Sequence, residues 1–191
     1  MMALSIEHGF TLWLALATTL HGAALAAQGR NEEAIAQIEE GLAATAATGA
    51  KMSRPGILNL LAGACIGTGR LDNGLAALTE ALAIADEHED RMYEGETHRL
   101  KGELLLRQNH LNVTEAQRCF QRAIEIARNR SAKSHELHAT MSLARLLDSQ
   151  GKRAEARAVL AEIYGWFTEG FDTADLKDAK ALLNELEGTR T

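Results

Sequence analysis

Apolar residues recur along this chain every three or four positions, in stretches that short polar turns separate. This spacing places them on one face of an α-helix. Four blocks repeat one arrangement: a small residue in one helical stretch, a second small residue in the next, and an apolar residue four positions later. The blocks are Gly22, Ala34 and Ile38; Ala62, Gly74 and Leu78; Gly102, Ala116 and Phe120; and Ala144, Ala156 and Leu160.

The blocks have a nearly constant spacing. Their second small residues lie at positions 34, 74, 116 and 156, so successive blocks are 40, 42 and 40 residues apart. A repeat of this length is typical of stacked helix pairs, because one pair cannot bury its apolar face without a neighbour. We predict an all-α solenoid of four antiparallel helix pairs plus a C-terminal capping helix. The expected repeats are 10–50, 53–89, 91–130 and 132–168, with the capping helix at 172–188, in a single domain over 1–191.

The spacing resembles the tetratricopeptide pattern, in which small and apolar residues occupy fixed places in two consecutive helices. The match is best in the fourth block, where Leu147 follows Ala144, and in the third, where Leu105 follows Gly102. Leucine or cysteine replaces most of the aromatic residues of that pattern, its closing proline is absent, and the period exceeds the usual value of about 34 residues. We expect longer helices, of about 16 to 18 residues each, to account for the difference.

Glycines mark the turns inside three of the pairs. Gly29, Gly69 and Gly151 each follow an apolar stretch, where a left-handed cap costs glycine least. The third turn, 108–112, lacks a glycine and is two residues longer, which accounts for the spacing of 42. We expect an asparagine to adopt the left-handed conformation there.

The two ends differ. Residues 3–8 resemble residues 83–88, which close the second repeat, so we expect 1–8 to be the remnant of a preceding repeat in a larger protein. At the other end, Asp172 is the predicted N-cap, with Phe171 and Leu176 as a hydrophobic staple. The expected apolar stripe of the capping helix is Leu176, Ala179, Leu182, Leu183 and Leu186.

Composition and charge narrow the function classes. The 191 residues are 46% hydrophobic and 24% charged, as in a globular protein, and carry a net charge of −6. That charge argues against a nucleic-acid partner, which needs a concentrated basic surface. A run of basic residues from Arg118 to Lys133 alternates with Glu115, Glu125 and Glu136, as on an exposed helix face. Cys65 and Cys119 have no partner at metal-ligand or disulfide spacing and are read as small buried residues, so a cytoplasmic location is expected.

The N-terminal stretch raises the alternative of a targeting or membrane segment. Residues 8–28 contain no Lys, Arg, Asp or Glu. However, Glu7 stands where a signal peptide carries positive charge, and Gly22 and Leu25 occupy the places of Ala62 and Cys65 in the repeat. We therefore assign the stretch to the first repeat and expect no membrane association.

Three stretches, 98–106, 132–147 and 151–186, resemble a known family in their actual sequence. They are similar to the C-terminal tetratricopeptide region of bacterial signalling proteins that carry an adenylate or guanylate cyclase-type domain and an ATPase domain upstream. The resemblance implies a non-catalytic protein interaction module in the regulatory part of such a protein. The alternative is a small-molecule sensor domain that controls the upstream cyclase or ATPase.

No catalytic constellation is found in the sequence. The glycine-rich run from Gly63 to Arg70 lacks the Lys-Ser/Thr ending of a phosphate loop and is read as a helix end. His135 and His138 flank Glu136 as half of a metal site, but no third ligand accompanies them. A metal-dependent enzyme is therefore the weaker alternative, and no metal or cofactor is predicted.

In tetratricopeptide arrays the first helix of each pair lines the concave face, which implies the residues of a partner groove. A protein or peptide is the expected ligand. Arg99, Arg107 and Arg145 favour an acidic peptide, because guanidinium groups bind carboxylates. The complete set is Asn59, Arg99, Glu103, Arg107, His138, Arg145 and Asp148.

A cluster of aromatic residues lies where the fourth pair meets the capping helix: Tyr164, Trp166, Phe167 and Phe171. Filling of the core at this junction is one interpretation. An exposed anchor for a partner is the other, because interfaces are enriched in tryptophan and tyrosine. Self-association of the chain is a further expectation.

Overall fold

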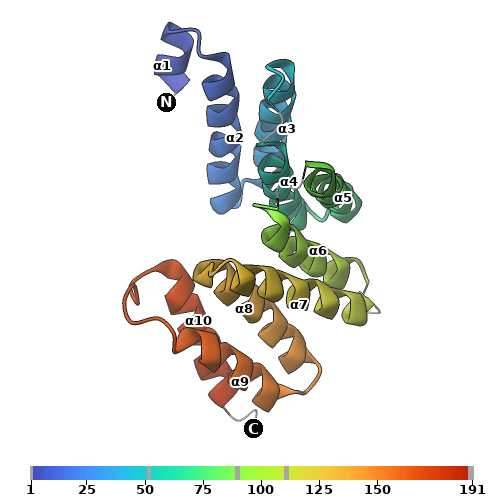
Figure 1. Cartoon of the computed structure of the whole chain (residues 1–191), viewed down its shortest axis with the longest axis vertical. Helices are drawn as coiled ribbons and strands as arrows, with labels where there is room; N and C mark the ends of the chain where they lie inside the picture. The colour runs from blue at the N-terminus through green and yellow to red at the C-terminus, as the bar shows by residue number, and fades with distance from the viewer. Residues whose placement is uncertain (1, 51–52, 89–90, 110–111, 189–191) are drawn as a thin grey trace.

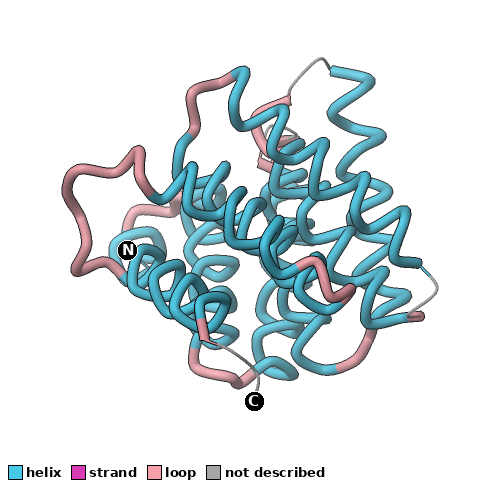
Figure 2. Tube along the Cα trace, turned by 90° about the horizontal axis from the view of Figure 1, so that it is seen from below, coloured by secondary structure: helices cyan, strands magenta, loops and turns pink. Residues whose placement is uncertain are grey.

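The computed structural model describes residues 2–50, 53–88, 91–109 and 112–188, and these residues form helices and no strands (Figure 2). The helices are α1 (Met2–Glu7), α2 (Thr11–Ala27), α3 (Asn31–Ala47), α4 (Arg54–Thr68), α5 (Leu71–His88), α6 (Glu94–Gln108), α7 (Val113–Asn129), α8 (Lys133–Ser149), α9 (Arg153–Tyr164) and α10 (Ala174–Glu187). None of the helices in this part of the chain is long and apolar enough to cross a membrane.

The helices stack in pairs along the chain, with the two termini at opposite ends (Figure 1). Helices α2 and α3, α4 and α5, α6 and α7, and α8 and α9 pack against each other, and each pair also contacts the next. The first helices α2, α4, α6 and α8 contact one another in sequence, and α10 extends this layer by contacting α8. Over the described ranges, the second helices make no close backbone contacts with one another, although Arg128 of α7 lies 3.7 Å from Glu162 of α9. The predicted all-α solenoid is therefore confirmed, with the first helices as its inner layer.

The repeated small residues lie where the helices of a pair approach most closely. A Cβ atom added at Gly22 would lie 2.7 Å from Cγ1 of Ile38 and 3.0 Å from the carbonyl oxygen of Ala34. One added at Gly102 would lie 2.5 Å from Cε1 of Phe120. The small residues of all four blocks are buried. In the first and third blocks, the glycine therefore allows the large apolar residue of the same block to enter the helix interface, whereas at Gly74 the neighbouring side chains are Leu104 of α6 and Cys65.

A further close contact between α2 and α3 was not predicted. A Cβ atom at Gly41 would lie 2.1 Å from Oγ1 of Thr19, 2.9 Å from its backbone nitrogen and 3.0 Å from the carbonyl oxygen of Ala15. Gly41 lies seven residues after Ala34, and the equivalent positions in the next two pairs are Ala81 and Ala123. Each pair except the fourth thus has a second small residue two helical turns after the first.

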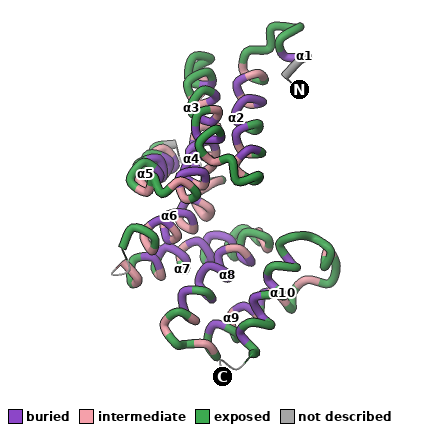
Figure 3. Tube along the Cα trace, turned by 180° about the vertical axis from the view of Figure 1, so that it is seen from behind, coloured by how far each residue is buried: buried purple, intermediate pink, exposed green. Residues whose placement is uncertain are grey.

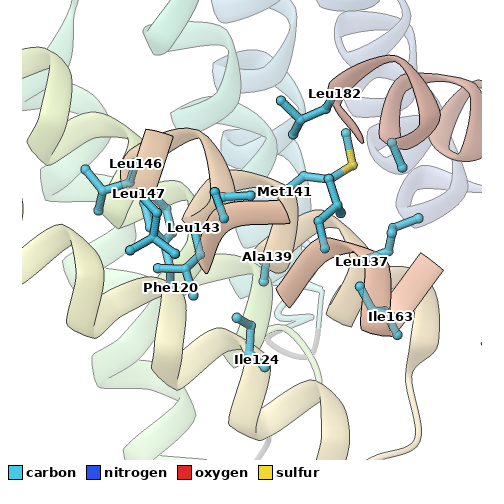
Figure 4. Packing of buried hydrophobic residues seen from close by; sticks show 14 of the residues in the cluster. Phe120, Ile124, Leu137, Ala139, Met141, Leu143, Leu146, Leu147, Ile163 and Leu182 are labelled. Atoms are coloured by element: carbon cyan, nitrogen blue, oxygen red, sulfur yellow. The ribbon is translucent and has the colours of Figure 1, made fainter. Parts of the chain in front are cut away.

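The core is a series of clusters along the stack, and buried residues face inward between neighbouring helices (Figure 3). The largest cluster joins the third and fourth pairs to α10, with Phe120, Leu147 and Leu160 fully enclosed (Figure 4). The predicted apolar stripe of the capping helix is confirmed, because all five of its residues belong to this cluster. Cys65 and Cys119 are buried and unpaired as expected, and burial raises the pKa of both thiols.

The glycine turns are confirmed. Gly29, Gly69 and Gly151 have φ values of 79°, 74° and 78°, in the left-handed region. The third turn differs, because Asn109 is extended at φ −157° and ψ 127° and does not take the left-handed conformation. Residues 110 and 111 of that predicted turn lie outside the described residues.

Two local predictions at the C-terminal end are wrong. Thr173, not Asp172, is the N-cap of α10, and Thr173 makes no side-chain capping hydrogen bond. The ring of Phe171 instead packs against that of Tyr164, with centroids 5.9 Å apart, while Leu176 joins the core. Helix α9 has 12 residues, fewer than predicted, because the chain leaves the helix at Gly165 to form the segment that carries the aromatic residues.

Gly41→Ala tests the close approach of α2 and α3. The new methyl group would meet backbone atoms of Thr19 and Ala15 that cannot rotate away, so we expect the free energy of unfolding to fall by about 1–3 kcal/mol. The matched control is Gly63→Ala in α4, where a Cβ meets nothing within 4 Å. It should raise the free energy of unfolding by about 0.5–1 kcal/mol. Urea denaturation of both variants measures the difference, and equal stabilities would contradict the described contact.

Candidate binding surface

A cavity of about 370 Å³ opens on the inner layer of the solenoid, in its N-terminal half. Its walls come from α2, the N-terminal half of α4, the residues that precede α6 with the first turn of α6, and His135 in the first turn of α8. Curvature of the array brings these four regions to one place, although they are far apart in the sequence. The lining residues are Trp13, Leu16, Thr19, Leu20, Ser53, Gly56, Ile57, Asn59, Leu60, Met92, Tyr93, Glu96 and His135.

Large apolar side chains at this cavity are exposed to solvent. Trp13, Leu20 and Met92 are 54%, 56% and 67% exposed. Gly56 permits the ring of Tyr93 to lie directly against α4, because a Cβ at that glycine would be 2.8 Å from Cζ of the tyrosine. Exposed apolar residues gathered at one cavity make it the candidate binding site of the inner layer.

The residues predicted from the sequence include few of those that line this cavity, although the sequence contains a feature that could have indicated it. The uncharged stretch 8–28, weighed above as a membrane segment, forms α2. A helix that is apolar on every side needs a partner for each side. In α2 one side packs against α3 and α4, while Trp13 and Leu20 line the cavity.

Asn59, a predicted groove residue, lies in the cavity wall but is buried. Its Nδ2 donates to the carbonyl oxygen of Tyr93 at 3.4 Å, and its Oδ1 accepts from the hydroxyl of Thr97 at 2.9 Å. These bonds connect α4 to α6 and hold Tyr93 at the cavity. Asn59 therefore positions a lining residue.

The predicted arginines on α6 are already paired with carboxylates. Arg99 donates to both carboxylate oxygens of Glu96, at 2.9 and 2.6 Å. Burial tends to lower the pKa of Arg99, but the hydrogen bonds to Glu96 and the negative charges of Glu96 and Glu103 together outweigh it and hold the pKa above its ordinary value. Arg107 donates to Glu103 at 3.1 Å, and Ser142 of α8 donates to the same carboxylate at 2.7 Å. Glu103 thus bridges two successive first helices.

The predicted groove residues of α8 have separate partners. Nε2 of His138 lies 3.1 Å from Oδ2 of Asp175 in α10, and Oδ1 of Asp148 lies 3.8 Å from Nε of Arg153. Arg145 is exposed and makes no ion pair with a described residue. Of the three predicted arginines, Arg145 can therefore bind a ligand carboxylate without breaking an ion pair within the described part of the chain.

The aromatic cluster is divided between core and surface. Tyr164 and Phe167 pack against the main hydrophobic cluster, whereas Trp166 and Phe171 are exposed. Nζ of Lys133 lies 5.5 Å from the ring centroid of Trp166, a cation–π contact between the segment that follows α9 and the start of α8. Core filling thus describes Tyr164 and Phe167, whereas the anchor role of the two exposed residues stays a prediction.

Glu136 between the two histidines is a buried structural carboxylate. It is 3% exposed, and it accepts hydrogen bonds from Nε of Arg128 and Nζ of Lys133, each at 2.7 Å. Burial tends to raise the pKa of Glu136, but these two cations outweigh it and hold the pKa below its ordinary value. Over the described residues, no group of three His, Cys, Asp or Glu side chains is placed to hold a metal ion.

Comparison with known proteins identifies the fold. No family model matches the chain, and no curated protein matches it significantly in sequence. Two solved structures, both described as a kinesin light chain of Podosopora anserina with nearly identical TPR-like repeats, match with a TM-score of 0.64 each. They are 19% and 18% identical to this chain, and each alignment covers 89% of this chain and 83% of the other. The fold is that of tetratricopeptide-like repeats. At this identity the likeness concerns the fold alone.

The buried carboxylate makes stability depend on pH. Because the pKa of Glu136 is lower in the folded state, its contribution is complete above the unfolded-state pKa and is lost as pH falls through the folded-state pKa. Glu136→Gln should lower the free energy of unfolding at pH 7 by about 1–3 kcal/mol. Denaturation at several pH values should show that the difference from wild type shrinks below about pH 4.

Glu162→Gln is the matched control, because Glu162 lies 3.7 Å from the same arginine, Arg128, but is 74% exposed. Its effect at pH 7 should stay within about 0.5 kcal/mol. Equal effects of the two substitutions, or a difference for Glu136→Gln that does not change with pH, would contradict the assigned role.

Proposed function

We propose that this chain is a non-catalytic protein interaction module that binds a segment of a partner protein along its inner layer. The observation that carries the proposal is the cavity at which Trp13, Leu20 and Met92 are exposed. A bulky apolar side chain of the partner enters this cavity. Its burial contributes about 1.5–3 kcal/mol to binding.

The polar half of the inner layer supplies the second part of the proposed groove. Glu103, Arg107, His138, Arg145 and Asp148 lie on α6 and α8, beyond the apolar cavity. Since Arg145 has no carboxylate partner in the described part of the chain, it is the proposed contact for an acidic group of the bound segment. Arg107 can share its charge with the same group while it remains paired with Glu103.

The exposed aromatic residues extend the proposed surface. Trp166 contacts Lys133, two residues before His135 at the edge of the cavity. Trp166 and Phe171 are therefore proposed as further anchors, for another protein or for a second copy of the chain. Analytical ultracentrifugation separates these two cases, because self-association raises the sedimentation coefficient with concentration.

The wider context follows from the sequence resemblance of residues 98–106, 132–147 and 151–186. We propose that the chain is a single repeat domain in the C-terminal regulatory part of a cytoplasmic bacterial signalling protein, with cyclase-type and ATPase domains upstream. The complete reading frame of the gene tests this: the two upstream domains would support the proposal, and their absence would contradict it.

A small-molecule sensor is the second candidate function. The inner cavity falls within the range of about 300–1,000 Å³ that is typical of small-ligand sites. A ligand-dependent rise of the unfolding temperature in a panel of metabolites would favour this function over the binding of a protein segment.

Selection of peptides from a random displayed library tests the apolar cavity. We expect the enriched peptides to share a bulky aliphatic or aromatic residue. Leu20→Asp should weaken their binding at least about tenfold, because the cavity would then contain a charge without a partner. Fluorescence anisotropy of labelled peptides measures the affinities. Arg118→Ala, at a highly exposed residue of α7, is the control that should leave them unchanged. Peptides that bind wild type and Leu20→Asp equally would contradict the proposed site.

The same peptides test the arginine positions. A peptide with acidic residues beside the apolar anchor should lose affinity on Arg145→Ala, by about tenfold for a charged hydrogen bond, and more in the triple alanine variant of Arg99, Arg107 and Arg145. The loss should diminish as salt concentration rises. Equal binding by wild type and the triple variant would remove the acidic-peptide hypothesis and leave the apolar cavity as the proposed site.

A further inference from the structure

The outer layer of the solenoid contains a cavity of about 360 Å³ over the fourth repeat. Helices α7 and α9 form its sides without close backbone contacts between them, and α8 lies beneath them. Apolar atoms of Ile124, Leu143 and Val159 line it, one residue from each helix. Ile124 and Leu143 belong to the main hydrophobic cluster (Figure 4). This site is separate from the inner layer and plays no part in the proposed partner groove.

A buried hydroxyl group in the cavity wall lacks a partner. Thr140 is 2% exposed, and its Oγ1 makes no hydrogen bond within the described part of the chain. Two buried threonines of the first pair differ in this respect. Thr19 in α2 and Thr45 in α3 each donate a hydrogen bond to the carbonyl oxygen four residues earlier, at 3.1 and 2.7 Å. A buried hydroxyl without a partner costs about 1–3 kcal/mol. A ligand acceptor in the cavity would recover part of this cost.

A guanidinium group borders the same cavity. Arg128 uses Nε to bind the buried Glu136, while its Nη2 lies 3.7 Å from the exposed Glu162. An exposed pair at this distance is weak, so the Nη atoms can exchange it for a ligand carboxylate. The other charged residue of the wall, Glu125, accepts a hydrogen bond from Arg122 at 2.9 Å, which offsets its repulsion of an anion. The amides of Gln121 and Asn129 complete the polar rim.

We propose that this outer cavity binds a small amphipathic carboxylic acid. The carboxylate accepts hydrogen bonds from the Nη atoms of Arg128 and from the hydroxyl of Thr140. The hydrocarbon tail packs against Ile124, Leu143 and Val159. The volume lies within the range of about 300–1,000 Å³ of small-ligand sites. The proposal does not depend on the function of the inner layer.

Isothermal titration of the whole chain with hexanoate and octanoate tests the proposal, with hexanamide and hexan-1-ol as neutral analogues. We expect saturable binding of one carboxylate per chain. Octanoate should bind more tightly than hexanoate by about tenfold, because it buries two more methylene groups. Hexanoate should bind at least about tenfold more tightly than hexanamide, because it gains a charged hydrogen bond.

Three variants locate the bound acid. Val159→Trp should abolish binding of the acid, because the larger side chain would fill the cavity from its partly exposed wall. Thr140→Val should weaken binding about fivefold, because it removes one hydrogen bond to the ligand while preserving the shape of the side chain. Glu162→Gln should strengthen binding of the acid by up to about fivefold, because it removes the carboxylate that competes with the ligand for Arg128. Circular dichroism and the unfolding temperature verify that each variant is folded. Leu20→Asp in the inner cavity is the control that should leave binding unchanged.

Several results would overturn the proposal. They are the absence of saturable binding by either acid to folded wild-type protein, equal affinities for hexanoate and hexanamide, and binding that survives Val159→Trp in a folded variant. Binding lost in Leu20→Asp but kept in Val159→Trp would place the acid in the inner cavity and would equally refute the outer site. The peptide experiments on the inner layer keep their meaning in every case, since they measure the binding of a different ligand.

Discussion

The structure depends on the close approach of two helices at positions that have almost no side chain. At Gly22, Gly41 and Gly102 the facing helix occupies the space that a Cβ would need. Where the backbones come this close, a large residue such as Ile38 or Phe120 can fill the remaining gap completely. Each pair thereby becomes a rigid unit with one apolar face left over, and the next pair must cover that face. Stacking follows from the packing inside each pair.

The inner layer is a consequence of this stacking. In the described part of the chain, successive first helices approach one another more closely than the second helices do, so side chains from α2, α4, α6 and α8 converge on one surface. The core beneath is supplied by the pairs themselves, so residues on this surface are free to vary in character without loss of the fold. The N-terminal half has exposed apolar groups such as Trp13, whereas the C-terminal half has paired charges such as Glu103 with Arg107.

Charged groups near the fourth repeat add polar connections between elements that the apolar core also joins. Glu136 is buried at the start of α8, and it stays ionised because Arg128 from α7 and Lys133 both bind it. Lys133 also contacts Trp166 beyond α9. The carboxylate thus holds the end of α7 and the start of α8 together, close to the segment that carries the exposed aromatic residues. Arg128 in addition borders the outer cavity, where the hydroxyl of Thr140 has no hydrogen-bond partner among the residues that the structure describes.

The sequence alone determined the helix pairs, their order and the close contacts of the four blocks. Each of these features depends on residues within about 40 positions of one another, so the periodicity of the sequence predicts them. It also located the left-handed glycines and the apolar stripe of α10. Tertiary structure decided the rest. The cavity that joins Trp13 to His135, the pairing of Arg99 with Glu96, and the burial of Glu136 depend on the curvature of the array and on side-chain conformations. A repeat pattern determines which helices are neighbours. It does not determine the curvature of the array or the side-chain conformations, because both arise only when all the pairs have packed.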